Sequence, residues 1–117
     1  ETDHLIDESV FCKMKKNAVL VCTARGNIID EDALYDALVN RKIAAAGLDV
    51  YAKEPLPVDS KLIGLDNIVL TPHVSSQTYE SIWYTYRKGV DIVADFFAGK
   101  ELGRGDLLNP DYIEHVK

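Results

Sequence analysis

Three short runs of apolar residues recur along the chain, each of strand length and each bounded by charged or turn-forming residues. They cover residues 18–22, 43–48 and 68–70. The first run has no polar position, which is typical of a parallel strand buried on both faces rather than of an alternating antiparallel one. Polar and ionisable residues follow each run directly. Because the carboxyl ends of parallel strands meet at one edge of an open sheet, we predict that these side chains converge there.

Helical periodicity marks the segments around these runs. Residues 30–40 begin with Asp30, a good N-cap residue, and continue with acidic residues that suit the positive end of a helix dipole. Apolar positions recur there at helical spacing, so 18–48 is predicted to form a βαβ unit with a right-handed crossover. A short amphipathic helix is expected within 3–16, and an ordered loop over 51–67. The chain is therefore assigned to the α/β class.

A longer helix is predicted over 77–98, capped by Ser75 or Ser76 and ended by Gly99. Its apolar residues form one stripe at helical spacing. The stripe consists of Ile82, Trp83, Tyr86, Val90, Val93, Ala94 and Phe97. The tail beyond this helix shows little periodicity.

The composition is that of an ordinary globular protein and narrows the classes of partner. Of the 117 residues, 47% are hydrophobic and 27% are charged, with a formal net charge of -6. The basic residues are scattered, which argues against nucleic acid and anionic membranes as partners, because a phosphate-binding face needs clustered Lys and Arg. No apolar run is long enough to predict a membrane-spanning helix.

Two further features concern cellular context. Cys12 and Cys22 have neither metal-ligand nor CxxC spacing, so they are interpreted as reduced thiols of an intracellular protein, and a cytoplasmic location is predicted. The chain opens on Glu1 without a methionine or a signal-like segment. We therefore expect it to be a piece of a longer protein.

Four ionisable side chains stand at or just beyond the ends of the apolar runs. Arg25 precedes a glycine and can present its guanidinium to a carboxylate or phosphate through two parallel hydrogen bonds, although a surface ion pair is the plain alternative. Taken alone, Glu54 suits a solvated loop charge, and His73 suits a structural role. As a pair they suit acid–base chemistry, because a carboxylate bonded to an imidazole fixes its tautomer and favours the protonated form that a general acid needs. Asp49, at a strand end, needs a partner such as a backbone N–H, and its alternative role is a helix or turn cap.

Other candidates receive plainer interpretations. The aromatic residues Tyr35, Tyr51, Trp83, Tyr84 and Tyr86 are assigned to packing. The segment 103–105 imitates the start of a GxGxxG fingerprint, but it lacks the third glycine and the strand–turn–helix context, so it is rejected.

Three motifs in order resemble the NAD-dependent D-isomer-specific 2-hydroxyacid dehydrogenases, a family that includes glycerate, glyoxylate/hydroxypyruvate, D-lactate and phosphoglycerate dehydrogenases. The resemblance runs from Thr2 to Pro110. The motifs are Cys22-Thr23-Ala24-Arg25-Gly26, then Ala46-Gly47-Leu48-Asp49-Val50 with Glu54-Pro55-Leu56-Pro57, then Asn67-Ile68-Val69-Leu70-Thr71-Pro72-His73.

The resemblance implies a fold and a domain division. The fold is a partial Rossmann-like parallel sheet of three strands with flanking helices, a fragment of a larger doubly wound domain. Residues 1–98 correspond to the C-terminal half of the NAD-binding domain, including a returning helix at 77–98, and residues 99–117 to a tail of the substrate domain. The family's glycine-rich phosphate loop has no counterpart in this chain, so the chain alone is expected to be inactive.

The resemblance also implies roles for individual residues. Arg25 would bind the substrate carboxylate and carbonyl, His73 would be the acid/base, and Glu54 would be its partner, whereas the related formate dehydrogenases carry Gln at that position. Asp49 would hold the nicotinamide carboxamide. The other positions that would line the nicotinamide end of the cofactor are Thr2, Cys22, Thr23, Ala24, Val74, Ser75 and Ser76.

The implied reaction is hydride transfer between NAD(H), with NADP not excluded, and a small 2-hydroxyacid or 2-oxoacid, in a protein that is a homodimer at full length. A dinucleotide-sensing protein without catalysis, similar to the corepressors that resemble this family, would keep the same motifs and stays open as an alternative. A metal hydrolase built on His73, Glu54 and Asp49 is disfavoured, because no second histidine has ligand spacing, and no metal site is predicted. A pure interaction module explains none of the strand-end residues.

Overall fold

The computed structural model describes residues 2–109 and 111. By its internal contacts the chain divides into two compact units, Glu1–Ser75 and Ser76–Lys117. The first contains α1 (Glu8–Phe11), β1 (Val19–Cys22), a 3-10 turn at Gly26–Ile28, α2 (Glu31–Val39), β2 (Ala45–Leu48) and β3 (Ile68–Leu70). The second contains α3 (Tyr79–Phe97) and a 3-10 turn at Arg104–Asp106.

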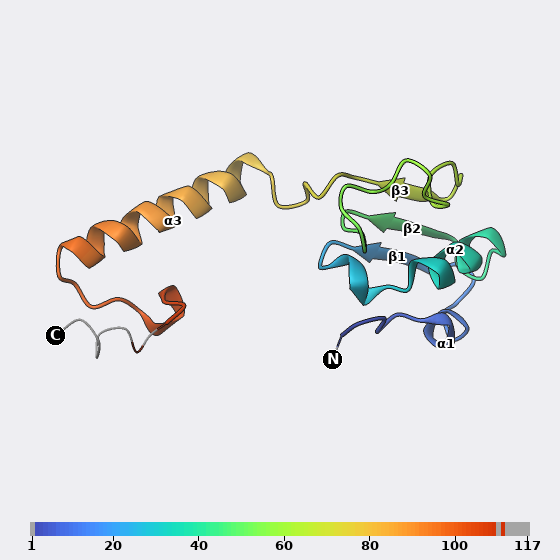
Figure 1. Ribbon diagram of the computed structural model, residues 1–117, viewed down its shortest axis with the longest axis horizontal. Coiled ribbons are helices and arrows are strands. Elements are labelled where there is room, and N and C mark those ends of the chain that lie inside the picture. Colours follow the sequence, from blue (N-terminus) through green and yellow to red (C-terminus); the bar gives the residue numbers. More distant parts are fainter. Residues whose placement is uncertain (1, 110, 112–117) are drawn as a thin grey trace. The chain divides into compact units, whose positions relative to one another are not determined.

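The first unit is built on a parallel three-stranded sheet in the order β1-β2-β3 (Figure 1). Val21 lies opposite Gly47, and Gly47 lies opposite Val69, so these residues form one row across the sheet. Helix α2 connects β1 to β2, as a βαβ unit requires. This arrangement confirms the predicted α/β class and the parallel sheet.

Helix α2 begins and ends where its sequence indicates. The carboxylate of Asp30 accepts hydrogen bonds from the amides of Asp32 and Ala33, both at 3.0 Å, and so satisfies N–H groups that have no partner within the helix. One face of α2, with Leu34 and Leu38, is completely buried against the sheet unit's core. The other fully or nearly fully buried core side chains include Phe11, Ile43, Leu48, Val50 and Leu62.

The prediction that the first strand is buried on both faces is wrong for the described residues. Cys22 points into the core, but Val19 and Val21 are 64% and 68% exposed, and Val69 on β3 is 66% exposed. Alternate residues of a strand face opposite sides of a sheet, and the elements of the first unit cover only one of those sides. We refer to Val19, Val21 and Val69 as the open sheet face.

The loop over 51–67 is ordered and contributes to the core, as expected for a long loop in a small domain. Leu62 is buried, and two exposed ion pairs fasten the loop to α2 and the turn after it. Lys61 Nζ lies 2.8 Å from the Asp32 carboxylate, and Arg41 Nη2 lies 2.8 Å from that of Asp66. The peptide between Glu54 and Pro55 is cis.

The second unit consists of α3 and the turn that follows it. Helix α3 is capped by Thr78, whose hydroxyl accepts a hydrogen bond of 3.1 Å from the Ser81 amide, so the predicted cap at Ser75 or Ser76 is wrong. Gly99 follows the helix with a φ of +70°, a conformation that glycine adopts without strain. An ion pair of 3.0 Å between Lys88 and Asp106 joins the helix to the 3-10 turn. No residue of α3 is buried.

Candidate active site

Glu54 and His73, predicted as a pair, are in direct contact at the carboxyl ends of the strands. The Nδ1 atom of His73 lies 2.7 Å from Glu54 Oε2, while Glu54 Oε1 accepts a hydrogen bond of 3.1 Å from the Tyr51 amide. Both contacts stabilise the carboxylate, and the contact with His73 has the larger effect, so the pKa of Glu54 lies below its ordinary value. An ionised carboxylate only accepts hydrogen bonds, so the hydrogen in this contact belongs to Nδ1. The other ring nitrogen of His73, Nε2, takes no part in the contact with Glu54.

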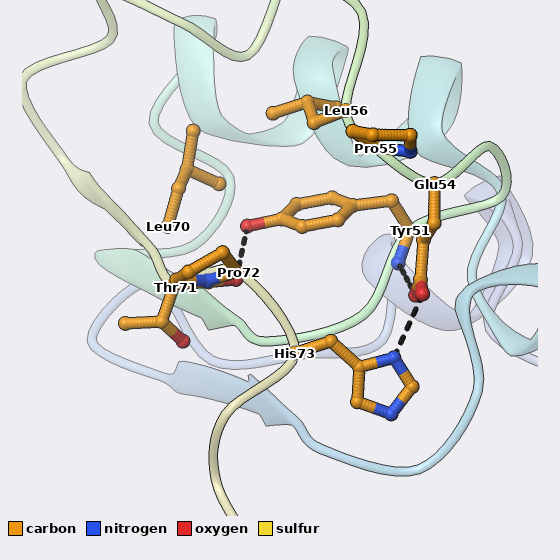
Figure 2. A pocket seen from close by; sticks show the side chains of 8 residues that line it. All are labelled: Tyr51, Glu54, Pro55, Leu56, Leu70, Thr71, Pro72 and His73. Atoms are coloured by element: carbon orange, nitrogen blue, oxygen red, sulfur yellow. Dashed lines mark hydrogen bonds and ion pairs between the residues drawn. The ribbon is translucent and has the colours of Figure 1, made fainter.

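A largely apolar hollow lies beside this pair. Figure 2 shows the Tyr51 ring crossing it, with the Glu54–His73 contact at one end. The lining residues are Tyr51, Glu54, Pro55, Leu56, Leu70, Thr71, Pro72 and His73. The apolar walls make this side of the pair less polar, which strengthens a charge-assisted hydrogen bond, although the His73 and Glu54 side chains stay 43% and 38% exposed.

Asp49 fixes the turn that carries His73. Its carboxylate accepts hydrogen bonds from the Thr71 hydroxyl at 2.5 Å, the Val74 amide at 2.9 Å and the Ser75 amide at 2.8 Å. These bonds, the one from Thr71 foremost, hold the pKa of Asp49 well below its usual range although burial opposes ionisation. His73 itself has a φ of +56°, which few non-glycine residues adopt. The geometry therefore assigns Asp49 the turn-capping function that was its plainer sequence interpretation.

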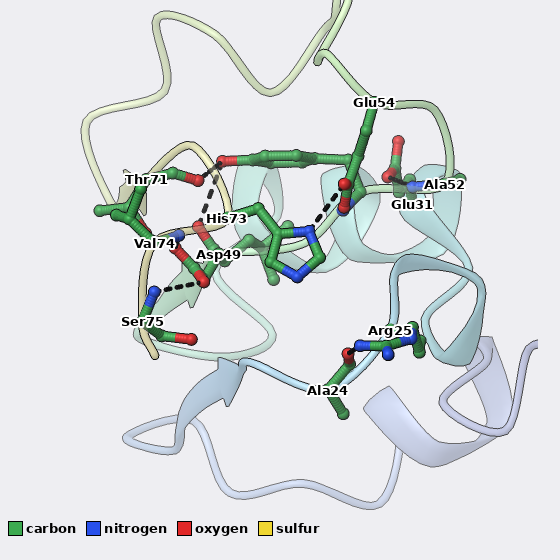
Figure 3. Close-up of polar contacts among 12 residues, drawn as sticks. Ala24, Arg25, Glu31, Asp49, Ala52, Glu54, Thr71, His73, Val74 and Ser75 are labelled. Atoms are coloured by element: carbon green, nitrogen blue, oxygen red, sulfur yellow. Dashed lines mark hydrogen bonds and ion pairs between the residues drawn. The ribbon is translucent and has the colours of Figure 1, made fainter. Parts of the chain in front are cut away.

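Arg25 shares a second hollow with the pair but does not touch it. This Arg25 hollow, of about 600 Å³, is lined by Arg25, Gly26, Asn27, Tyr51, Ala52, Glu54 and His73. The Arg25 side chain is exposed, and its Nη1 donates a hydrogen bond of 2.7 Å to the carbonyl of the preceding Ala24 (Figure 3). Its positive charge also favours the ionised form of Glu54 and so contributes to the lowered pKa of that residue.

The remaining predicted cofactor positions fall into three groups. Thr23 and Ala24 after β1 and Val74 and Ser75 after β3 are exposed at the carboxyl edge of the sheet. Ser76, with which the second unit begins, is also exposed. Cys22 is buried, with its thiol 3.9 Å from the Arg25 carbonyl. Among the described residues, no hydrogen bond joins Thr2 to the strand ends, and its carbonyl accepts one from the Leu5 amide.

Tyr51 and Thr71 have structural functions at the site that the sequence analysis missed. The Tyr51 hydroxyl, assigned only to packing, donates to the Thr71 carbonyl at 2.8 Å and lies 3.2 Å from the Leu48 carbonyl, so it joins the ends of β2 and β3. Burial, together with the nearby Asp49 charge, raises the pKa of Tyr51. Thr71 supplies the shortest bond to Asp49. The only signal in the sequence was position: Thr71 follows an apolar run directly, and Tyr51 comes three residues after the end of one.

The described residues contain neither a candidate metal-binding cluster nor a membrane-spanning helix. Within 2–109 and 111, no group of three or more His, Cys, Asp or Glu side chains could hold a metal ion. In the same part of the chain, no helix has the length and apolar character needed to cross a membrane.

The fold and the site together define a class. Parallel α/β sheets bind ligands at the carboxyl ends of their strands, and here that edge holds the Glu54–His73 pair, Arg25 and small exposed side chains. These features are typical of part of a dinucleotide-binding domain.

The comparison with protein families identifies the class more closely. Residues 1–75 match the model of the D-isomer specific 2-hydroxyacid dehydrogenase, NAD binding domain. This chain belongs to that family, as its motifs predicted.

Individual relatives agree with this assignment. The chain is 43% identical over 114 residues to glyoxylate/hydroxypyruvate reductase B of Pectobacterium atrosepticum, an alignment that covers 97% of this chain and 35% of the relative. It is 45% identical over 100 residues to the protein of the same name from Enterobacter agglomerans, covering 86% and 31%. The chain therefore spans about a third of the length of these curated relatives.

Solved structures show the same fold. A D-lactate dehydrogenase with NAD+ from Lactobacillus jensenii superimposes with a TM-score of 0.78 at 30% identity, covering 88% of this chain and 36% of that one. An NADPH-dependent glyoxylate/hydroxypyruvate reductase from Sinorhizobium meliloti, in complex with citrate, gives a TM-score of 0.76 at 34% identity, covering 87% and 33%.

Proposed function

We propose that this chain is the C-terminal part of a reductase that transfers hydride between NAD(P)H and a small 2-oxoacid such as glyoxylate or hydroxypyruvate. The observation that carries the proposal is the contact of 2.7 Å between His73 and Glu54, which line the same hollow as Arg25. The names of the relatives supply the substrate class. In this assignment residues 1–98 complete the NAD-binding domain and residues 99–117 belong to the substrate domain.

Each residue has one task in the proposed reaction. Arg25 holds the substrate carboxylate, since a guanidinium binds a carboxylate through two parallel hydrogen bonds. His73 donates a proton from Nε2 to the oxygen of the substrate carbonyl during reduction and takes it back during oxidation. Glu54 holds Nδ1–H, so it orients the ring and stabilises the imidazolium that donates.

The described residues fit a nicotinamide at this edge of the sheet. A flat ring needs small neighbours and an open approach, and Thr23, Ala24, Val74 and Ser75 are small or moderate in size and exposed there. Asp49 suits a carboxamide N–H, in addition to its bonds to Val74 and Ser75. A bound nicotinamide supplies the hydride, and the protein supplies orientation and the proton.

A pH profile of the full-length protein that carries this chain tests the proposal. Glu54→Gln removes the negative charge that favours the imidazolium, so the descending high-pH limb of oxoacid reduction should move to lower pH. Lys53→Gln, a change of charge at a neighbouring loop position, serves as the control and should leave the limb in place. An unchanged profile in Glu54→Gln would remove Glu54 from the mechanism. A full-length protein that binds the dinucleotide tightly without turnover would instead favour the sensing alternative.

We also propose a cytoplasmic location and a homodimer for the full-length protein. The location rests on the two cysteines, which are both free. The homodimer rests on the family resemblance.

A further inference from the structure

Glu31 contacts the loop that carries Glu54, although it belongs to a different element. Its Oε1 accepts a hydrogen bond of 2.7 Å from the Ala52 amide (Figure 3). The neighbouring amide, that of Tyr51, donates to Glu54 Oε1, and Glu54 Oε2 contacts His73. Two consecutive amides of one loop are thus bound by two carboxylates, one outside the Glu54–His73 pair and one inside it.

The contact comes from a rigid support. Glu31 is the first residue of α2, directly after the Asp30 cap, and the buried face of this helix is part of the core. A hydrogen bond from a fixed helix start restrains a loop more than one from another loop does, because the helix does not move with it.

The backbone at Gly26 makes a second contact with the same peptide, the one between Tyr51 and Ala52. A Cβ atom on Gly26 would lie 1.9 Å from the carbonyl carbon of Tyr51 and 2.3 Å from the Ala52 nitrogen, so the backbone at Gly26 lies directly against the backbone of this loop. The loop is therefore held between the Arg25–Gly26 turn and the start of α2. Its position relative to Arg25 and His73 depends on both contacts.

We propose that Glu31 is a positioning residue, which fixes the 51–54 loop so that Glu54 meets His73 across the hollow from Arg25. The catalytic meaning of this inference rests on the function proposed above, whereas the restraint on the loop does not. Besides His73, the charged group that acts on Glu54 is Arg25 after β1, and Asp49 after β2 and Glu31 act on the neighbouring Tyr51.

Three variants separate the hydrogen bond from the charge. Glu31→Ala removes the acceptor, whereas Glu31→Gln keeps an oxygen at the same reach and removes the charge. Asp32→Ala is the matched control, because it also removes an acidic side chain from the first turn of α2, but its carboxylate pairs with Lys61, further along the loop, and not with residues 51–54.

Amide exchange in the 117-residue chain is the primary measurement. In Glu31→Ala, exchange at the Ala52 and Tyr51 amides should accelerate by about tenfold or more, since local opening exposes both. The 13C titration of the Glu54 carboxyl should move toward its ordinary pH range, because the contact with His73 is loosened. Glu31→Gln and Asp32→Ala should both stay close to the unaltered chain.

Two results would overturn the inference. One is faster exchange at Ala52 alone, with Tyr51 and the Glu54 titration unchanged, which would make Glu31 a local cap. The other is an equal effect of Glu31→Gln and Glu31→Ala, which would show that only the charge matters. Turnover of the full-length protein distinguishes the two proposals: kcat should fall about tenfold in Glu31→Ala with little change in KM, since small displacements of catalytic groups are costly. If the exchange and titration change but turnover does not, the acid–base function fails and the restraint on the loop stands.

Discussion

The two oxygens of Glu54 have different partners, and this division determines how the residue responds to acid. One oxygen accepts from the Tyr51 amide and the other contacts His73. Because the pKa of Glu54 is lowered in the folded chain, protonation is less favourable there than in the unfolded chain. The contact therefore stabilises the fold above the unfolded-state pKa, and this stabilisation is lost as the pH falls through the folded-state pKa.

Thermal unfolding measures this dependence. In His73→Ala the largest cause of the lowered pKa is absent, so the loss of Tm between about pH 5 and pH 3 should be smaller than in the unaltered chain. The change of Tm with pH is the relevant quantity, since His73→Ala also changes the Tm at neutral pH. Asp7, whose pKa is also lowered by local bonds, keeps its contribution in both chains. Parallel slopes would show that the contact contributes nothing to acid stability.

Arg25 is the second residue whose chemistry can be measured singly. Lys keeps the charge but not the planar pair of donors, so Arg25→Lys in the full-length protein should lose roughly 2–4 kcal/mol of transition-state stabilisation, which is about thirty- to thousand-fold in kcat/KM. Arg41→Lys is the control, because Arg41 lies just past the end of α2 in an exposed ion pair with Asp66, away from the site. A change of less than about threefold in Arg25→Lys would make Arg25 structural.

Among the elements, the turn between β1 and α2 is the least tolerant of substitution. Gly26→Ala places a methyl group within the backbone of Tyr51 and Ala52, so the free energy of unfolding should fall by about 1–3 kcal/mol or more. Gly89→Ala is the matched control, because no atom lies within 4 Å of its Cβ in the middle of α3, and it should stabilise the helix by about 0.5–1 kcal/mol. Chemical denaturation of both variants checks the prediction, and a neutral Gly26→Ala would contradict the close approach described here.

The elements that sequence periodicity fixes are those with strong local signals. The strands and α2 follow from apolar runs and from the Asp30 cap, and the meeting of Glu54 with His73 follows from the parallel order of the strands. The start of α3 could not be predicted in this way. The amides of Val74 and Ser75 are bound by Asp49, far earlier in the chain, so the helix begins only after Thr78.

Two other features, one at the site and one on the sheet, also depend on tertiary contacts. Glu31 is typical of any first helical turn, and nothing in the sequence indicates that it binds the Ala52 amide. An apolar run predicts burial but does not say what covers each side, so the open sheet face could not be predicted.

At the scale of the whole chain, exposed apolar surface determines behaviour in solution. The open sheet face includes Val19 and Val21 of β1, a strand that has a neighbour on one side only among the described residues. Helix α3 also exposes nine large hydrophobic side chains. Edges and apolar patches of this kind favour association. Light scattering of the 117-residue chain should show self-association. Val19→Lys with Val21→Lys should reduce it, whereas Val58→Lys, at a loop position already 96% exposed, should not. A monodisperse monomer would contradict the prediction.

Cofactor binding is the second property of the whole chain that can be measured. The phosphates of a dinucleotide need a glycine-rich loop at a helix N-terminus, and the chain contains no GxGxxG segment. Calorimetry should therefore show no saturable NAD binding up to about millimolar cofactor. Tight binding would overturn both this expectation and the proposed inactivity of the chain alone.

The bonds of Asp49 end where the first unit ends. Val74 and Ser75 are tied to the end of β2, and the second unit begins at the next residue, Ser76. A pivot located after Ser75 would leave His73 on the stationary side, with its ring still aligned to Glu54. Domain closure in an enzyme is useful only if it does not disturb groups that are already aligned. The Asp49 carboxylate thus separates the alignment of His73 with Glu54 from any motion of the chain beyond Ser75.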